Sequence, residues 1–255
     1  MSAPLQGKVA IVTGGSRGIG RAIVDRFARD GAAVVDASRS SVADGHDRVL
    51  AIRTDVAEPE DVRRLVEETV QRLGGIDVLV NNAALELEGT IEQTDPEAWD
   101  RLMRVNLRGP FLCAKYALPA LRERHGTIIN IASVDGYWAE PGLAAYCASK
   151  GGLMALTRAI ALDHGHEGIR CTAICPSYVR TDMLEQFFDA QPRPDDARAD
   201  AAAMHPLNRL SEPDEIASLA AWLASDEAAF ATGQAFVLDG GLTAGRVQHD
   251  DGRSA

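Results

Sequence analysis

Ser133, Tyr146 and Lys150 are the residues of this 255-residue chain whose types and spacing suit acid–base chemistry. Tyr146 and Lys150 lie four residues apart, so any helix that carries them presents both on one face. A free phenol has a pKa near about 10, but a cation at roughly 4 Å in an effective dielectric near 20 favours the phenolate by roughly 4 kcal/mol. The pair therefore predicts a general acid or base at Tyr146. Ser133, at the end of an apolar run, is placed to offer a hydroxyl to the same reacting oxygen.

The lysine is informative because Lys8, Lys115 and Lys150 are the only lysines among the 26 basic residues. A compact, titratable ammonium, in a chain that otherwise uses arginine, indicates that this position needs that particular group. The alternative is an amphipathic helix with an incidental tyrosine. The Tyr-x-x-x-Lys spacing alone does not separate these two interpretations.

A glycine-rich turn follows the first apolar run of the chain. Residues 13–20 read TGGSRGIG and lead directly into an amphipathic segment. Glycines at such a strand-to-helix turn let the backbone approach a pyrophosphate, whose charge rests on the helix N-terminus. The turn therefore predicts a nucleotide site, with a simple strand-to-helix connection as the alternative.

Short β-branched runs alternate with longer amphipathic segments along the chain. This alternation predicts an α/β fold, a Rossmann-like doubly wound seven-stranded parallel sheet with helices on both faces. The length and the 46% hydrophobic content fit a single domain over residues 1–255. The predicted strands are residues 9–13, 33–37, 49–53, 77–81, 128–131, 170–174 and 235–238, and the predicted helices are residues 20–29, 58–73, 97–106, 144–163 and 213–224.

Two segments lack a clear core pattern. Residues 182–208 contain Phe187 and Phe188 followed by a polar, proline-containing stretch. A long insertion before the last βα units predicts a substrate lid, with a surface helical hairpin as the alternative. Residues 245–255 are polar and predict a flexible tail or an arm between subunits.

The composition argues against several classes of function. The net charge of -11 and the pI near 5.0 disfavour nucleic acid or an anionic membrane as a partner. No stretch approaches the roughly 20 apolar residues of a membrane span, and the N-terminus lacks a signal-peptide pattern, so we expect a cytoplasmic protein. The four cysteines show no Cys-x-x-Cys pairing, which predicts buried free thiols rather than disulfides or a metal site.

Several ordered motifs point to one family. The glycine spacing TGxxxGxG differs from the GxGxxG of common dinucleotide folds. It is followed in order by Asn81-Asn82-Ala83-Ala84, Asn106, Ser133, the Tyr146/Lys150 pair and Val237-Leu238-Asp239-Gly240-Gly241. Over about residues 5–243 the chain strongly resembles the short-chain dehydrogenase/reductase family.

The resemblance implies an oxidoreductase that moves a hydride reversibly between a nicotinamide cofactor and a secondary alcohol or ketone. Ser133 would hydrogen-bond the substrate oxygen, Tyr146 would exchange its proton, and Lys150 would lower the pKa of Tyr146 and hold the nicotinamide ribose. Asn106 would anchor a water that relays protons to Lys150. A catalytically silent cofactor-binding sensor or scaffold on the same fold is the competing function. The cofactor-binding residues implied are Gly14, Ser16, Arg17, Gly18, Ile19, Gly20, Ser38, Arg39, Asp55, Val56, Asn82, Ala83, Tyr146, Lys150, Pro176, Val179 and Thr181.

Three positions depart from the family pattern. Ala84 and Ser177 stand where glycine is usual, and Thr172 replaces a frequent asparagine. None of these changes removes a catalytic group. Ser177 lies near the expected nicotinamide end, so its conformation is the point most open to question.

The choice of dinucleotide depends on the end of the second strand, where an acidic residue would accept hydrogen bonds from the ribose of NAD(H). The family pattern places Ser38 at that position, followed by Arg39, and Arg17 lies within the glycine turn. Two guanidinium groups suit the 2′-phosphate of NADP(H), which we therefore favour. Asp36 keeps NAD(H) as the alternative, because it lies on the same strand face as Ser38.

The substrate is expected to be a small alcohol or ketone, and its identity stays open between sugar, cyclic alcohol and 3-oxoacyl substrates. Glu86 and Glu88 suit a polyol, whereas the aromatic residues near the site suit a cyclic apolar ketone. The resemblance also implies a homotetramer, paired through helices around residues 107–121 and 144–163 and through the last strand. The predicted pocket residues are Trp138, Glu140, Phe187 and Phe188.

Overall fold

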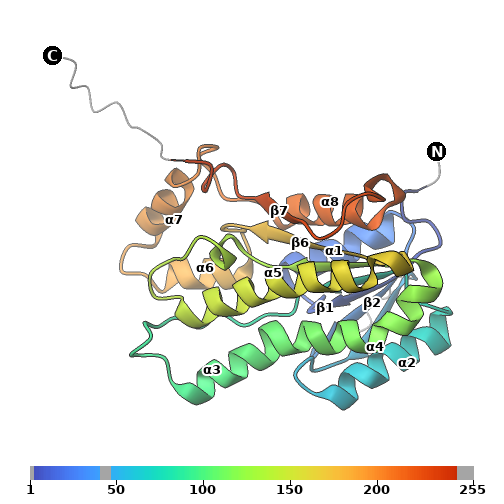
Figure 1. The fold of residues 1–255 in the computed structure, drawn as a ribbon. Helices are drawn as coiled ribbons and strands as arrows, with labels where there is room; N and C mark the ends of the chain where they lie inside the picture. The colour runs from blue at the N-terminus through green and yellow to red at the C-terminus, as the bar shows by residue number, and fades with distance from the viewer. Residues whose placement is uncertain (1–2, 41–46, 246–255) are drawn as a thin grey trace.

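The computed structural model describes residues 3–40 and 47–245. Within them, seven strands form one parallel sheet in the order β3-β2-β1-β4-β5-β6-β7 (Figure 1). This confirms the predicted doubly wound α/β fold. The chain winds outward from β1 in both directions, so a crevice opens at the carboxyl ends of β1 and β4, where such folds bind ligands. The strands are β1 (Val9–Thr13), β2 (Ala33–Ser38), β3 (Val49–Arg53), β4 (Val78–Asn81), β5 (Thr127–Ile131), β6 (Arg170–Pro176) and β7 (Ala235–Leu238).

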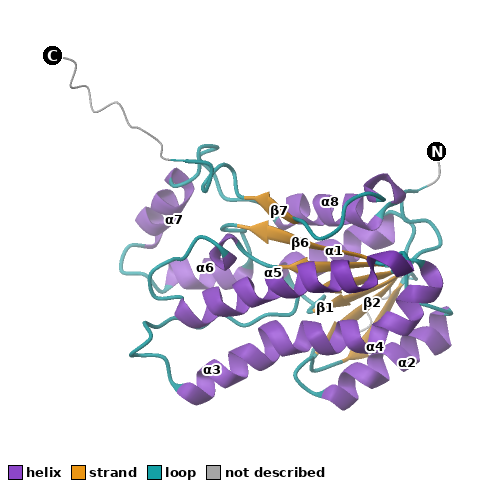
Figure 2. Cartoon of the chain, viewed as in Figure 1, coloured by secondary structure: helices purple, strands orange, loops and turns teal. Residues whose placement is uncertain are grey.

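Helices cover both faces of the sheet (Figure 2). Successive strand residues point to opposite faces, so Ala10 and Val12 of β1 join one core while Ile11 joins the other. The first core is closed by α1 (Gly18–Arg29) and α8 (Pro213–Ala224). The second is closed by α2 (Pro59–Leu73), α4 (Gly109–Arg124) and α5 (Ala144–His164). Both faces of the central strands are therefore apolar, as the β-branched runs predicted.

The helical stretch before β5 is longer and less regular than predicted. α3 (Pro96–Met103) continues into a π-helical segment, η1 (Arg104–Arg108), and then into α4. The predicted helix ended at residue 106, inside this π-helical turn. Turns of this kind concentrate at functional sites, and Asn106 lies within this one.

The segment predicted to be a lid forms two short helices, α6 (Asp182–Asp189) and α7 (Pro194–Ala203). Figure 1 places them beyond the arrowheads of β6 and β7, at the carboxyl end of the sheet. Arg198 of α7 holds the two together, because its guanidinium forms ion pairs with Glu185 at 2.8 Å and with Asp189, and stacks over the ring of Phe188. The pair of helices therefore forms one cross-linked unit.

The short helical turns are η2 (Val134–Gly136), η3 (Gly165–Glu167) and η4 (Asp226–Ala228). All four cysteines are free thiols, as predicted. Among the residues described, none of the helices is long and apolar enough to cross a membrane. Most of the tail predicted to be flexible, residues 246–255, lies outside the described residues.

Candidate active site

A cleft of about 1710 Å³ lies at the carboxyl ends of the strands and gathers residues from distant parts of the sequence. It joins the glycine turn after β1, the ends of β2 to β6, the start of α5 and the helix α6. It is lined by these predicted site residues: Gly14, Ser16, Arg17, Gly18, Ile19, Gly20, Ser38, Arg39, Asp55, Val56, Asn82, Ala83, Ser133, Trp138, Glu140, Tyr146, Lys150, Pro176, Val179, Thr181 and Phe187.

Phe188 is a correction to the predicted pocket. Its side chain is buried and packs with Ala201 and Leu210, and it does not line the cleft itself. Adjacent helical residues point about 100° apart, so the aromatic pair divides between two surfaces. Phe187 faces the cleft, and Phe188 forms the small core that supports α6 and α7.

The glycine turn is shaped by close backbone contacts. Gly14 and Gly18 have φ of 66° and 54°, a region that side chains disfavour. A Cβ at Gly20 would lie 2.1 Å from the carbonyl oxygen of Gly14, so only glycine fits there. The side-chain amide of Asn82 donates to the carbonyls of Thr13 and Gly14 at 3.0 and 3.1 Å, which fixes the turn against the loop after β4.

The N-terminus of α1 fits a pyrophosphate. Arg17 occupies the N-cap position without a side-chain bond to the first turn, and that turn contains no acidic residue. The backbone N–H groups of the first turn and the positive end of the helix dipole therefore point toward the cleft without a competing carboxylate. These residues fit the dinucleotide that the motif implied.

The end of β2 separates the two candidates for the ribose partner. Ser38 and Arg39 line the cleft. Asp36 does not: its carboxyl packs beneath the glycine turn, where a Cβ at Gly15 would meet Asp36 Oδ1 at 2.7 Å. Its position on the same strand face as Ser38 therefore does not bring it to the cleft surface.

The three residues of the acid–base set meet at the carboxyl end of β5. Ser133 follows the strand and caps the short turn η2. Tyr146 and Lys150 lie one turn apart on α5, with Lys150 Nζ 5.3 Å from the centroid of the Tyr146 ring. Lys150 is buried and donates a hydrogen bond from Nζ to the carbonyl of Ile131 at 2.8 Å. The sheet thus fixes the lysine head group beside the phenol.

The pKa of Tyr146 differs from the expectation. Burial raises the pKa of this phenol above its ordinary range, the carboxyls of Glu86 and Asp135 raise it further, and the Ser133 hydroxyl offsets only part of the effect. Burial also lowers the pKa of Lys150 to about 8, so its cation is itself destabilised. The expected lowering of the Tyr146 pKa by Lys150 is therefore not seen in this environment.

Asn106 lies beneath the cleft rather than on its wall. Its side-chain oxygen accepts from the N–H of Leu85 at 2.7 Å, and its amide nitrogen donates to the Leu85 carbonyl and to Ser149 Oγ at 2.8 and 3.2 Å. Both amide hydrogens are thus in use. The side chain ties the loop after β4 to α5, and the water relay that the resemblance implied would need another atom, such as a backbone carbonyl of the π-helical turn.

Three polar contacts in the cleft were not predicted. Ser133 Oγ donates to Asp135 Oδ2 at 2.9 Å, and the Tyr178 hydroxyl donates to Glu140 Oε1 at 2.6 Å. Ser177 Oγ lies 2.8 Å from Nε2 of the buried His205. Asp135 was detectable as an acid two residues after the strand-terminal serine, whereas the other two contacts join segments whose proximity no local pattern shows.

Comparison with known proteins identifies the family. The family model described as "Enoyl-(Acyl carrier protein) reductase" matches residues 14–243. The chain is 39% identical to meso-2,3-butanediol dehydrogenase of Serratia marcescens over 93% of its length and 95% of the relative's. It is 36% identical to a 3-oxoacyl-[acyl-carrier-protein] reductase of Thermotoga maritima, over 93% of this chain and 98% of the relative. The chain belongs to the short-chain dehydrogenase/reductase family.

A solved structure supports the same assignment. The ligand-free aldohexose dehydrogenase of Thermoplasma acidophilum superimposes with a TM-score of 0.92 at 35% identity, covering 98% of this chain and 100% of that one. Members of the short-chain dehydrogenase/reductase family bind a nicotinamide cofactor. This chain is accordingly an oxidoreductase that acts between such a cofactor and a secondary alcohol or ketone.

Proposed function

We propose that this protein oxidises small neutral secondary alcohols, and reduces the matching ketones, in this cleft, with NADP(H) as the favoured cofactor. One observation carries the proposal: Ser133, Tyr146 and Lys150 converge in the same cleft as the glycine turn and the N-terminus of α1, which has no side-chain cap. The alternative, a silent cofactor-binding scaffold, does not require this convergence.

In the proposed mechanism, the bound nicotinamide supplies or accepts the hydride. Tyr146 exchanges a proton with the substrate oxygen, and Ser133 hydrogen-bonds the same oxygen. Lys150, positioned by the carbonyl of Ile131, holds the nicotinamide ribose and contributes a positive charge beside the phenol. The raised pKa of Tyr146 keeps it protonated at neutral pH, the form that reduction needs.

Replacing Tyr146 by Phe tests this assignment. The ring and its packing are kept, while the exchangeable proton is removed. We expect turnover to fall at least about a thousandfold while cofactor binding, followed by nicotinamide fluorescence, is retained. Unchanged turnover in Tyr146→Phe would overturn the catalytic assignment, and a wild-type enzyme that binds cofactor but turns over no alcohol or ketone would favour the scaffold.

The preference for NADP(H) is supported by charge at the adenosine end. Ser38 and Arg39 line the cleft, Arg17 lies across from them on the glycine turn, and Asp36 is turned inward. Guanidinium groups bind a phosphate dianion strongly. We expect a higher kcat/KM with NADP(H) than with NAD(H). Arg39→Ala should lower the ratio of these two kcat/KM values about tenfold. A higher kcat/KM with NAD(H) would reject the preference.

Two relatives point to diols as substrates to test first. The Serratia marcescens relative is named for meso-2,3-butanediol, and a 40% identical relative from Sphingobium indicum is named a 2,5-dichloro-2,5-cyclohexadiene-1,4-diol dehydrogenase. Hydroxyl-rich substrates also suit a cleft whose walls carry Glu86, Asp135 and Glu140. We place such neutral alcohols ahead of acyl-carrier thioesters. The free thiols fit a reducing compartment, the cytoplasm.

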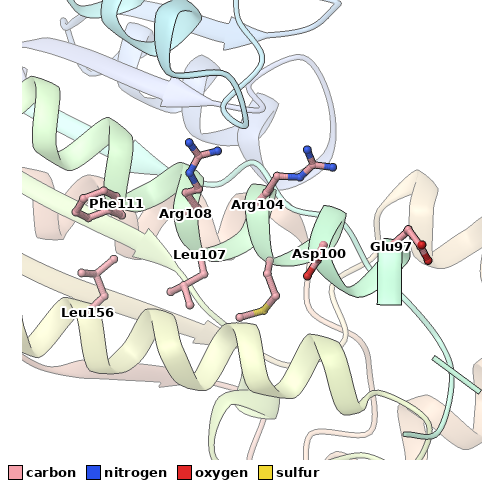
Figure 3. Close-up of a pocket in the computed structure, with 8 residues that line it drawn as sticks. Glu97, Asp100, Arg104, Leu107, Arg108, Phe111 and Leu156 are labelled. Carbon is pink, nitrogen blue, oxygen red and sulfur yellow. The ribbon is translucent and has the colours of Figure 1, made fainter. Parts of the chain in front are cut away.

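We also propose a homotetramer. A second groove, of about 880 Å³, runs between η1, α4 and α5, outside the cleft (Figure 3). Figure 3 shows the apolar side chains of Leu107, Phe111 and Leu156 toward one end of the groove, with the acidic side chains of Asp100 and Glu97 toward the other. Further exposed apolar side chains, Trp222, Phe230 and Val237, lie around α8 and β7. These two surfaces match the helices and the last strand named above as the pairing elements.

A further inference from the structure

Asp135 and Ser133 bind each other through two reciprocal hydrogen bonds. The Asp135 backbone N–H donates to Ser133 Oγ at 3.1 Å, and Ser133 Oγ donates its hydrogen to Asp135 Oδ2 at 2.9 Å. A hydroxyl has one hydrogen to donate. While that hydrogen is on the carboxylate, Ser133 is unable to donate it to a substrate oxygen.

The acidic side chains around Asp135 do not take the place of Ser133 as its hydrogen-bond donor. Glu86 and Glu140 are both carboxyls, and each lies close enough to Asp135 for the negative charges to repel each other. Glu140 already accepts from the Tyr178 hydroxyl. Burial raises the pKa of Asp135 and Lys150 offsets part of the rise, but among the described residues the Lys150 ammonium donates to the Ile131 carbonyl and not to Asp135. This wall of the cleft is therefore rich in acceptors, and it repels anions while welcoming neutral hydroxyl groups.

We propose that Asp135 is a specificity-determining residue that selects substrates with a hydroxyl on the carbon next to the reacting one. The neighbouring hydroxyl donates to Asp135 in place of Ser133, and Ser133 then turns its hydrogen to the reacting oxygen. A substrate without that hydroxyl must break the Ser133–Asp135 bond with no replacement. The inference rests on the proposed function, since it takes Ser133 as the residue that binds the reacting oxygen.

Matched alcohols test the exchange in the full-length protein. The probes are butane-2,3-diol against butan-2-ol, and cyclohexane-1,2-diol against cyclohexanol, each measured as kcat/KM with the preferred cofactor. We expect the wild type to prefer the diol of at least one pair by about ten- to a hundredfold. Asp135→Ala should reduce that ratio to within about threefold of one, because the second hydroxyl loses its acceptor while release of Ser133 raises activity on the mono-alcohol.

Two further variants separate this role from a structural one. Asp135→Asn keeps the side-chain shape and one acceptor oxygen, so it should retain part of the diol preference. Asp163→Ala removes the same charge from the exposed end of α5 and should leave the ratio at its wild-type value. Circular dichroism and thermal melting verify that each variant is folded.

The outcomes are distinct. A diol ratio that is unchanged in Asp135→Ala, an equal loss on both members of a pair, or a wild type that shows no preference for either diol would each overturn the inference. Failure of the proposed function itself has a different signature, unchanged turnover in Tyr146→Phe.

Discussion

At the scale of single residues, the pKa of Tyr146 is raised first by burial and then by two carboxyls from other segments of the chain. Glu86 from the loop after β4 and Asp135 from η2 both raise the pKa of this phenol. Alcohol oxidation needs the phenolate as base, so its rate should rise as the pH increases toward the raised pKa. Reduction needs the phenol and should be insensitive to pH in the neutral range.

Replacing Glu86 by Gln removes one of these charges. We expect the alkaline rise of the oxidation kcat/KM to move to lower pH by about half to one unit, because the phenolate is then less strongly repelled. The pH profile of kcat/KM, measured with a mono-alcohol, reports the change. Glu92→Gln, an exposed acid outside the cleft lining, is the control and should leave the profile in place. A profile that does not move would mean that another group governs it.

Lys150 should make stability depend on pH. Its pKa falls to about 8 in the folded chain from 10.5, so between these values the unfolded chain binds one more proton and stability rises with pH. The rise amounts to about 3 kcal/mol over that interval. Relative to Lys150→Met, the wild type should therefore gain stability from pH 8 to 10.5, measured by denaturant unfolding. Lys115→Met, at an exposed lysine, should show no such change; a flat difference for Lys150→Met would contradict the shift.

Single residues also show what sequence reasoning can and cannot reach. The residues of the cofactor and catalytic motifs were found because each occupies a fixed place after a strand or on a helix turn. Phe188 was misplaced because an aromatic pair does not reveal which member faces the ligand. Asp135 was missed because its significance depends on a hydrogen bond to Ser133, and that bond follows from a local turn rather than from residue type.

At the scale of elements, the loop after β6 is fastened to the end of the lid. His205 Nδ1 lies 2.8 Å from the carbonyl of Ala201, which only accepts, so Nδ1 carries the proton and Nε2 accepts from Ser177. Ser177 is the residue that replaces the usual family glycine next to the expected nicotinamide site. Ser177, which departs from the family pattern, thus has a hydrogen-bond partner in the segment that follows α7.

Breaking this contact should weaken cofactor binding without changing the chemistry. We expect His205→Leu and Ser177→Gly each to raise the KM for the cofactor about five- to tenfold, because the loop that carries Val179 and Thr181 is then less fixed. Steady-state kinetics of the two single variants and the double variant measure the coupling, and the double variant should add little to either. His166→Ala, an exposed histidine, serves as the control. Additive effects would show that the two residues act separately.

Elements also differ in how well sequence predicts them. The strands were predicted to within about two residues, because β-branched runs bounded by turn residues are compatible with few other secondary structures. The π-helical turn at residues 104–108 was not, since an apolar period near 3.6 continues on both sides of it. The helices α6 and α7 lie in the segment predicted as a lid, with a helical hairpin as the alternative; their bounds were not predicted, because short helices depend on tertiary contacts, here the ion pairs of Arg198.

At the scale of the whole molecule, the parallel doubly wound fold followed from the alternation of strands and helices, whereas assembly depends on surfaces. The groove in Figure 3 is lined by apolar side chains together with acids and arginines. Both signs of charge on one patch allow it to pair with itself across a two-fold axis. Phe111, 45% exposed, is an apolar side chain that such pairing would cover.

Phe111→Glu should therefore break this interface. A buried carboxylate facing its own copy is strongly unfavourable, so light scattering should give about four times 27.2 kDa for the wild type and half of that or less for the variant. Ile91→Glu, an equally drastic change at a 76% exposed position outside both the groove and the cleft, should keep the wild-type mass. Leu156 of α5 lines the same groove, so loss of the partner should expose it and also lower the melting temperature of the variant. A wild-type monomer, or a variant of unchanged mass, would show that this groove is not the interface.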